Sequence, residues 1–285
     1  MVISGLLYGL LSAFAFGTAD FLAGLSSRRI GSYTTLIYMQ AVGLAVLSIY
    51  LFSSDEWHSI MNHGYMVMLA MIFMGIDLLG ILCLYQGLAI GKVSIVAPIA
   101  SSFAAITVIL AIIFGETPSI ITLIGIILTI IGVIIASLKL TEEPSSKSSR
   151  KGIMWAILAS ILLGVAFFGL KFPTSQMGAF STVWIGRAQS IIALPLILRV
   201  FKQKPKRPQL ADIGWISLVG IFDVIALISY NLGITTANTS VVVTITSLFA
   251  IVTMIWGIIV WKERIIWNQI LGISTILIGI LLINL

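Results

Sequence analysis

The stretch YMVMLAMIFMGIDLLGILCLYQG, residues 65–87, is apolar except for Gln86 near its end and an acid at its centre, Asp77. A helix needs about 20 mostly apolar residues to cross a bilayer. This stretch therefore predicts a membrane-spanning helix that carries a carboxyl group in mid-membrane. A second stretch, IGWISLVGIFDVIALISYNLG at residues 213–233, has the same form, with Asp223 at its centre.

The whole chain shares this character. Of its 285 residues, 59% are hydrophobic and only 9% are charged, whereas a soluble domain has about 25% charged residues. The composition excludes a soluble enzyme. The net charge of +6 comes from Lys and Arg clustered between apolar runs, not from a basic solvated face, so nucleic acid is not an expected partner. The single Cys83 says nothing about the redox compartment.

Apolar runs recur along the chain at spacings typical of a polytopic membrane protein. The predicted spans are residues 3–25, 33–52, 65–87, 93–114, 119–138, 152–171, 180–200, 213–233, 239–260 and 266–284. Apolar and polar residues do not alternate along these runs as they do in the strands of a membrane β-barrel. The sequence therefore predicts an all-α membrane protein with ten transmembrane helices, and connections too short to hold a soluble domain.

Basic residues orient such proteins, because cytoplasmic loops are rich in Lys and Arg. One side of the predicted bundle has nearly all of them: Arg28, Arg29, Lys92, Lys139, Lys147, Arg150, Lys151, Arg199, Lys202, Lys204, Lys206, Arg207, Lys262 and Arg264. The opposite side has Lys171, and Arg187 lies inside a span. We expect a protein of the cell membrane with both termini outside the cytoplasm. Its basic loops also suit contact with anionic lipid.

The second half of the chain repeats the first. A shift of 147 residues places Gly17 on Gly164, and a shift of 146 places Asp77 on Asp223. A unit of five helices is odd, so the second copy enters the membrane from the opposite side. The predicted organisation is two inverted five-helix repeats, residues 1–140 and 152–285, joined by a cytoplasmic linker, residues 141–151. Inverted repeats are common in secondary transporters, with the site near the midplane between the repeats. A duplication that only builds a stable bundle is the alternative.

The repeat also has recognisable motifs. The sequence from Ser94 to Pro98 (SIVAP), with Gly115-Glu116 and then Gly125 and Gly132, resembles the repeat of the EamA family in the drug/metabolite transporter superfamily. The second copy has matching residues at Ser240, Glu263, Gly272 and Gly279, and Thr244 where Pro98 stands. The resemblance covers essentially the whole chain. It implies ten helices around a central cavity, with the fifth and tenth at the periphery, and transport of small metabolites such as amino acids, or of drugs.

Ionisable groups in the hydrocarbon region are costly and mark functional sites by default. Besides Asp77 and Asp223, the spans contain Asp20 and Arg187, and the repeat partner of Arg187 is the neutral Gln40. An unpaired buried charge is strongly destabilising, so we expect Arg187 to pair with at least one acid. The remaining acid is then available to bind a cationic solute or to carry a proton. A structural ion pair that only joins helices is the alternative.

Helical spacing indicates which side chains accompany these charges. The predicted companions are Tyr85 for Asp77, Tyr230 and Asn231 for Asp223, and Trp184 for Arg187. Aromatic rings beside carboxylates suit an organic cation, although packing or interfacial anchoring would also explain them. Arg187 and an acid together suit a zwitterion, whose carboxylate would bind the guanidinium. Pro98 is a candidate for gating, because it can kink its helix.

The sequence has no cofactor motif. The nearest approach to a phosphate-binding loop, residues 87–93, lacks the required spacing and hydroxyl group, and no group of residues has metal-ligand spacing. The sequence thus predicts a secondary transporter, favouring an exporter, that moves amino acids, amines or related metabolites and drugs by alternating access. Expected partners are the solute, protons and membrane lipid, and the expected state is a monomer or weak homodimer. A membrane-embedded enzyme and a non-transporting scaffold are the alternatives. No histidine lies deep in a span, which counts against the enzyme.

Overall fold

Long apolar helices make up the protein in this computed structural model, which describes residues 2–53, 57–115, 119–137, 147–200, 202, 205–237, 239–262 and 267–282. The helices are α1 (Val2–Ile30), α2 (Ser32–Ser53), α3 (Trp57–Asn62), α4 (Gly64–Ile90), α5 (Val93–Ser101), α6 (Phe103–Ile113), α7 (Ile120–Ser137), α8 (Lys147–Gly169), α9 (Lys171–Met177), α10 (Ala179–Val200), α11 (Leu210–Thr236), α12 (Thr239–Ser247), α13 (Phe249–Trp261) and α14 (Trp267–Leu282). The described part of the chain contains no strand, as the sequence predicts. Most of the predicted linker, residues 141–146, and the motif glutamates Glu116 and Glu263 lie outside the described residues.

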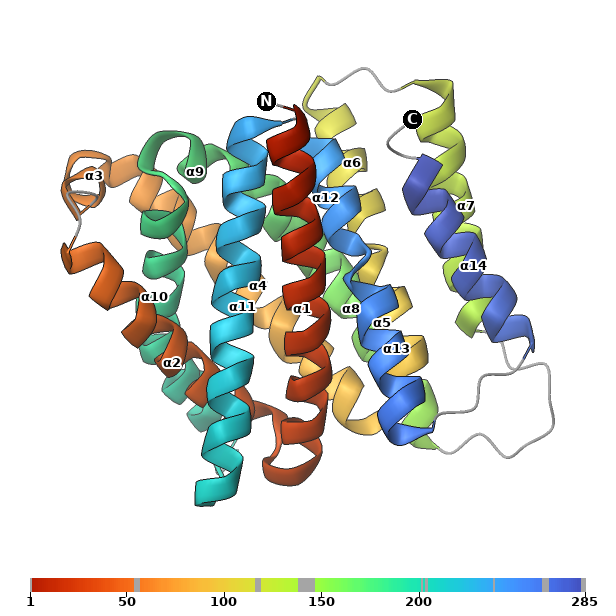
Figure 1. The fold of residues 1–285 in the computed structure, drawn as a ribbon, viewed down its shortest axis with the longest axis horizontal. Coiled ribbons are helices and arrows are strands. Elements are labelled where there is room, and N and C mark those ends of the chain that lie inside the picture. Colours follow the sequence, from red (N-terminus) through yellow and green to blue (C-terminus); the bar gives the residue numbers. More distant parts are fainter. Residues whose placement is uncertain are drawn as a thin grey trace.

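Within the described residues, eight segments are long and apolar enough to cross a membrane. They are Ser4–Ile30, Ser32–Ser53, Gly64–Ile90, Val93–Ile113, Arg150–Met177, Ala179–Val200, Asp212–Thr236 and Val241–Trp261. The helices α7 and α14 contain shorter apolar segments, Leu123–Gly132 and Ile270–Leu282. These two helices pack against each other and lie at one edge of the bundle (Figure 1).

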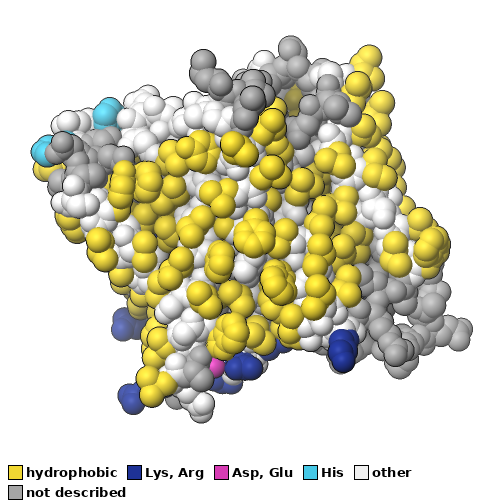
Figure 2. Space-filling view, in the orientation of Figure 1, with side chains coloured by type: hydrophobic (Ala, Val, Ile, Leu, Met, Phe, Trp, Pro, Cys, Tyr) yellow, Lys and Arg dark blue, Asp and Glu magenta, His cyan; other side chains and the backbone are white. Residues whose placement is uncertain are grey.

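The two ends of the bundle differ in charge. Helix α1 begins and α14 ends at the same end, the upper one in Figure 1. In the same view, the Lys and Arg side chains gather at the lower end and apolar side chains cover the belt between the ends (Figure 2). An apolar belt of this kind suits contact with the hydrocarbon layer of a membrane. Helices can cross that layer because their backbone groups hydrogen-bond within the helix.

Two of the predicted spans are divided by matched breaks. α5 and α6 meet at Ser102, with φ −63° and ψ −4°, and α12 and α13 meet at Leu248, with φ −64° and ψ −5°. Ser102 and Leu248 are repeat partners at a shift of 146. The first half has Pro98 in the helix before the break and the second half has Thr244 there, so the proline alone does not explain the break.

The hydrogen bonds at the breaks give a better explanation. The N–H of Ser102 donates to Ile99 O at 3.2 Å instead of to Pro98 O, and the hydroxyl of Ser101 then donates to that free carbonyl at 2.8 Å. In the second half, Leu248 N–H donates to Ile245 O at 3.1 Å and Ser247 donates to Thr244 O at 2.6 Å. A serine that satisfies the displaced carbonyl is thus common to both breaks.

Helix packing also occurs in matched pairs. α1 packs along α11, and their repeat partners α8 and α4 pack in the same way. α1 also packs on α13, as α8 packs on α6, while α2 packs on α11, as α10 packs on α4. Each of these helix contacts thus has a counterpart formed by the repeat partners of the same two helices.

The closest crossings are matched residue by residue. Thr253 Oγ1 donates to Gly17 O at 3.1 Å, and Thr107 Oγ1 donates to Gly164 O at 3.0 Å. A Cβ atom at Gly17 would stand 2.5 Å from the Cβ of Val252. Small residues at these positions therefore allow the backbones to approach closely, as membrane helix packing requires.

Candidate functional site

A cavity lies in the middle of the bundle, where α1, α4, α6, α8, α11 and α13 meet. The space between its walls, counted out to the open solvent, is about 410 Å³. Its described lining is Phe16, Asp20, Asp77, Ile81, Leu84, Phe103, Leu163, Phe167, Asp223, Leu227 and Phe249. Apart from Leu84, these residues form repeat pairs at shifts of 146 or 147, so both halves build the same wall.

The lining follows helical periodicity. Phe16 and Asp20 are one turn apart on α1, and Leu163 and Phe167 hold the matching positions on α8. Residues four apart share one helix face, so one face of each of these two helices turns toward the cavity. Asp20 and Phe167 are repeat partners, and the cavity therefore has an acid on one side where it has a ring on the other.

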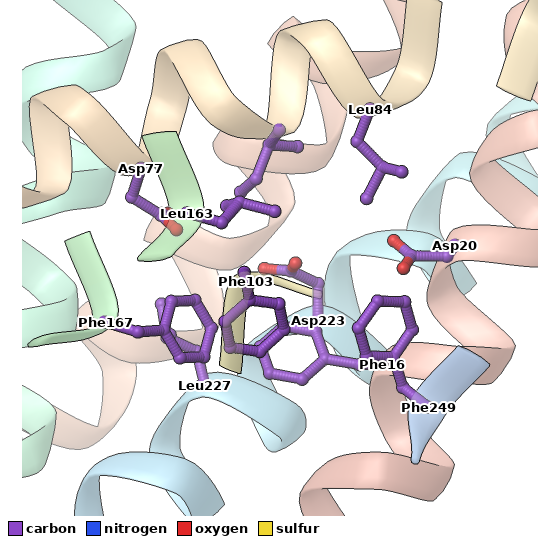
Figure 3. A pocket seen from close by; sticks show the side chains of 11 residues that line it. Phe16, Asp20, Asp77, Leu84, Phe103, Leu163, Phe167, Asp223, Leu227 and Phe249 are labelled. Atoms are coloured by element: carbon purple, nitrogen blue, oxygen red, sulfur yellow. The ribbon is translucent and has the colours of Figure 1, made fainter. Parts of the chain in front are cut away.

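Three carboxyl groups line this cavity. Asp20, Asp77 and Asp223 are 6%, 2% and 4% exposed, and in the view of Figure 3 their carboxyl groups lie in a row above the phenylalanine rings. Asp77 and Asp223 thus share the cavity, as their matched positions predict. In the described part of the chain, no hydrogen bond or ion pair is formed by Asp20 or Asp77. Among the described residues, no group of three His, Cys, Asp or Glu side chains is placed so that it could hold a metal ion.

Arg187 lies behind the third acid. Its side chain is fully buried on α10 and forms an ion pair with Asp223 on α11. The other terminal nitrogen donates to Gln40 Oε1 on α2, the repeat partner of Arg187. Gly43, one turn further along α2, makes room for it, since a Cβ there would be 3.2 Å from Nε. The expected ion pair is present, and neither Arg187 nor Gln40 is among the residues that line the cavity.

The structure places the other predicted site residues away from the cavity wall. Trp184 Nε1 donates to Ser48 Oγ at 2.9 Å, which joins α10 to α2. Tyr85 donates to Met39 Sδ at 3.0 Å. Tyr85 was expected beside Asp77 and Trp184 beside Arg187, because each pair shares a helix face, but a helix face is wider than the strip that lines the cavity.

The remaining three residues also have structural contacts. Tyr230 donates its hydroxyl to Phe167 O at 3.0 Å, directly behind the cavity wall. Asn231 accepts from Thr174 Oγ1 at 2.6 Å and donates to Leu227 O at 2.8 Å. Pro98 lies within α5, four residues before the break.

Sequence reasoning missed the aromatic part of the wall. The rings of Phe16, Phe103, Phe167 and Phe249 lie opposite the acids in Figure 3. Phe103 and Phe249 match in the repeat and begin α6 and α13 directly after the breaks. The repeat match of the two phenylalanines was the available signal, because the sequence predicts unbroken spans there and the helix starts appear only in the structure. Phe167 could have been found as the repeat partner of Asp20.

The fold is that of a polytopic membrane protein with a duplicated architecture. Its helices are long enough to span a membrane, its two halves match, and an acidic cavity lies between them. The sequence profile of the EamA-like transporter family matches residues 3–138 and again residues 150–285. The chain therefore belongs to the EamA-like transporter family.

Two further comparisons found similar proteins. A protein of Methanocaldococcus jannaschii, described as uncharacterized, is 32% identical over 136 residues, which are 97% of that protein and 47% of this chain. That relative is thus about as long as one half of this chain. A solved crystal structure superposes with a TM-score of 0.68 at 13% identity, covering 99% of this chain and 96% of the other, and it shows the likeness of the fold.

Proposed function

We propose that this protein is a secondary transporter that moves small organic solutes across the cell membrane by alternating access, in the direction of export. Its solutes are amino acids, amines or related metabolites and drugs. In this proposal ten helices form two inverted five-helix repeats, residues 1–140 and 152–285, with residues 141–151 as the linker and both termini outside the cytoplasm. Membership of the EamA-like transporter family supports transport as the general function.

The observation that carries the proposal is the place of the cavity. Its wall consists of repeat-matched residues from both halves, and it contains buried carboxyl groups without a partner among the described residues. Transporters built from inverted repeats bind their solute at this kind of interface. A bundle stabilised only by packing has no need of unpaired acids there, because each one is costly.

A difference between the halves supports alternating access. α1 runs unbroken from Val2 to Ile30, whereas its repeat partner is divided into α8 and α9 at Leu170. Arg187 pairs with Asp223 in the second half, while Gln40, the matching residue in the first half, accepts from Arg187 and forms no hydrogen bond with Asp77 in the described structure. Two halves of like sequence and unlike conformation can exchange their conformations, and this exchange would open the cavity to the other side.

Flux through proteoliposomes tests the proposal. The purified full-length protein is reconstituted, and uptake of labelled amino acids, amines and quaternary ammonium compounds is measured against an internal unlabelled pool of the same compound. Protein-dependent exchange without ATP is the expected result, and Asp77→Asn should abolish it. Chemical alteration of a solute, detected by mass spectrometry, would favour a membrane-embedded enzyme. Absence of flux for every compound would favour a scaffold.

A further inference from the structure

The charge around the cavity has one sign. Its described lining contains three carboxyl groups and no Lys, Arg or His. Arg187 neutralises Asp223 from behind, which leaves Asp20 and Asp77, both more than nine-tenths buried, with no ion pair in the described part of the chain. An uncompensated carboxylate away from water is costly, so the cavity is complementary to a positive charge.

The opposite wall is a ring of phenylalanines. The centroids of Phe16 and Phe167 are 6.0 Å apart, and those of Phe167 and Phe103 are 4.7 Å apart. Phe103 is 6.1 Å from Phe249, and Phe249 is 6.4 Å from Phe16, which closes the circuit. Each half contributes two of the four rings. The faces of aromatic rings attract cations, especially cations that are poorly hydrated.

We propose that the cavity selects organic cations with an apolar body, such as amines and quaternary ammonium compounds, over zwitterions and anions. The proposal rests on the proposed function in taking this cavity as the solute site. The carboxyl groups of Asp20 and Asp77 balance the charge of the cation, and the four rings contact its apolar body. A metal ion fits less well, since it requires several oxygen ligands at about 2.0–2.6 Å and the described acids are not clustered in that way.

An amino-acid zwitterion would bring a carboxylate as well. Arg187 is the basic residue that pairs with an acid of the cavity wall, and both of its terminal nitrogens already donate, to Asp223 and to Gln40. It is not part of the cavity wall. The carboxylate of a zwitterion would therefore meet acids and rings, which disfavour it.

Binding to the purified full-length protein in detergent tests this selectivity without requiring transport. The probes share a phenylethyl body and differ in charge: trimethyl(2-phenylethyl)ammonium, L-phenylalanine, 3-phenylpropanoate and 2-phenylethanol. Isothermal titration calorimetry should give the cation an affinity at least about tenfold higher than that of the other three, which is about 1.4 kcal/mol. Equal or tighter binding of the zwitterion or the anion, or no binding of the cation, overturns the proposal.

Variants separate the contribution of charge from that of the rings. Asp20→Asn and Asp77→Asn should each lower cation affinity about tenfold, while Asp212→Asn, at the N-terminus of α11 and outside the cavity, should not. Phe103→Leu and Phe249→Leu keep apolar volume and should lower cation affinity roughly threefold to thirtyfold. Phe21→Leu, whose ring stacks on Trp256 outside the cavity lining, is the matched control. An equal loss for 2-phenylethanol would show that the rings provide packing alone and would overturn the assignment of a cation cage.

The two proposals fail in different ways. Tight, selective binding of the cation in detergent without flux in proteoliposomes would retain the selectivity and refute transport. Flux of an amino acid or an anion in preference to the cation would retain transport and refute the selectivity.

Discussion

At the scale of single residues, Arg187 shows how a charge can be held inside a membrane. It is fully buried and joins three helices, since it lies on α10 and bonds Asp223 on α11 and Gln40 on α2. Its planar fork suits two partners at once. Within the described residues its Nε has no hydrogen-bond partner, so the stability of this cluster depends on the two terminal nitrogens.

Arg187→Leu should lower the free energy of unfolding by about 3–5 kcal/mol, because Asp223 would remain buried without its counter-charge. The measurement is unfolding of the purified protein followed by loss of helical signal. The double variant Arg187→Leu with Asp223→Leu removes both charges and should recover a large part of the loss. Equal destabilisation of the single and double variants would contradict a direct pairing.

Arg187→Lys separates a structural role from a role in binding. Lysine keeps the charge but cannot reach both partners with a planar fork, so thermal stability should fall. Since Arg187 does not line the cavity, affinity for trimethyl(2-phenylethyl)ammonium should stay within about twofold, less than 0.5 kcal/mol. A tenfold loss of affinity at unchanged stability would place Arg187 in the solute site after all.

At the scale of elements, the helix breaks position the aromatic wall. Each break shifts one backbone hydrogen bond from the fourth to the third preceding residue, and a serine hydroxyl takes up the carbonyl that is left. Phe103 and Phe249 begin the helices that follow. The orientation of these two rings therefore depends on the geometry of the breaks.

Ser101→Ala and Ser247→Ala should each cost about 1–3 kcal/mol of stability, because each removes the hydroxyl group that donates to a buried carbonyl at the break. Ser160→Ala is the matched control. Ser160 makes the same kind of bond, to Ile157 O at 2.9 Å, but within the unbroken helix α8, where the carbonyl also accepts a backbone N–H. If thermal unfolding shows equal losses at all three serines, the breaks do not depend on the hydroxyl groups.

Gly17→Ala and Gly164→Ala should both destabilise the protein, and by similar amounts. A Cβ at Gly164 would stand 2.6 Å from the Cβ of Ile106, much as one at Gly17 would meet Val252, so the helices would have to move apart. Gly214→Ala, on α11, meets nothing within 4 Å and should be tolerated. A large loss at one glycine and none at its repeat partner would argue against matched packing of the halves.

At the scale of the whole molecule, charge sets the expected orientation. The end of the bundle where α1 begins lies opposite the end where Lys and Arg gather (Figures 1 and 2). Cytoplasmic loops are rich in these residues, and the anionic cytoplasmic leaflet attracts them. The basic end is therefore expected in the cytoplasm.

Single cysteines introduced in a Cys83→Ala background test this orientation. A membrane-impermeant maleimide added to intact cells should label Met61→Cys, which is exposed on α3, and should not label Pro205→Cys, which is exposed beside Lys206 and Arg207 at the other end. Permeabilised cells provide the control, since both cysteines should then react. Labelling of Pro205→Cys alone in intact cells would reverse the orientation.

The sequence by itself determined the class of protein, because apolar runs of membrane-spanning length have few alternatives in a bilayer. It also determined the repeat, and it predicted a site at Asp20, Asp77, Asp223 and Arg187, since a charge in such a run has to be accommodated. Composition and register are local properties of the chain, and they can be read without knowing how the helices pack.

Only the tertiary structure decided which side chains share the cavity. Tyr85 and Tyr230 share helix faces with the acids but bond elsewhere, and Phe103, Phe167 and Phe249 come together from three helices. The tertiary structure also pairs Arg187 with Asp223, whereas Asp77 forms no ion pair with any of the described residues. Helical periodicity tells which residues lie on one face of a helix. The rotation of each helix against its neighbours depends on close contacts at glycines such as Gly17 and Gly164. These contacts join residues far apart in the chain, so periodicity does not reveal them.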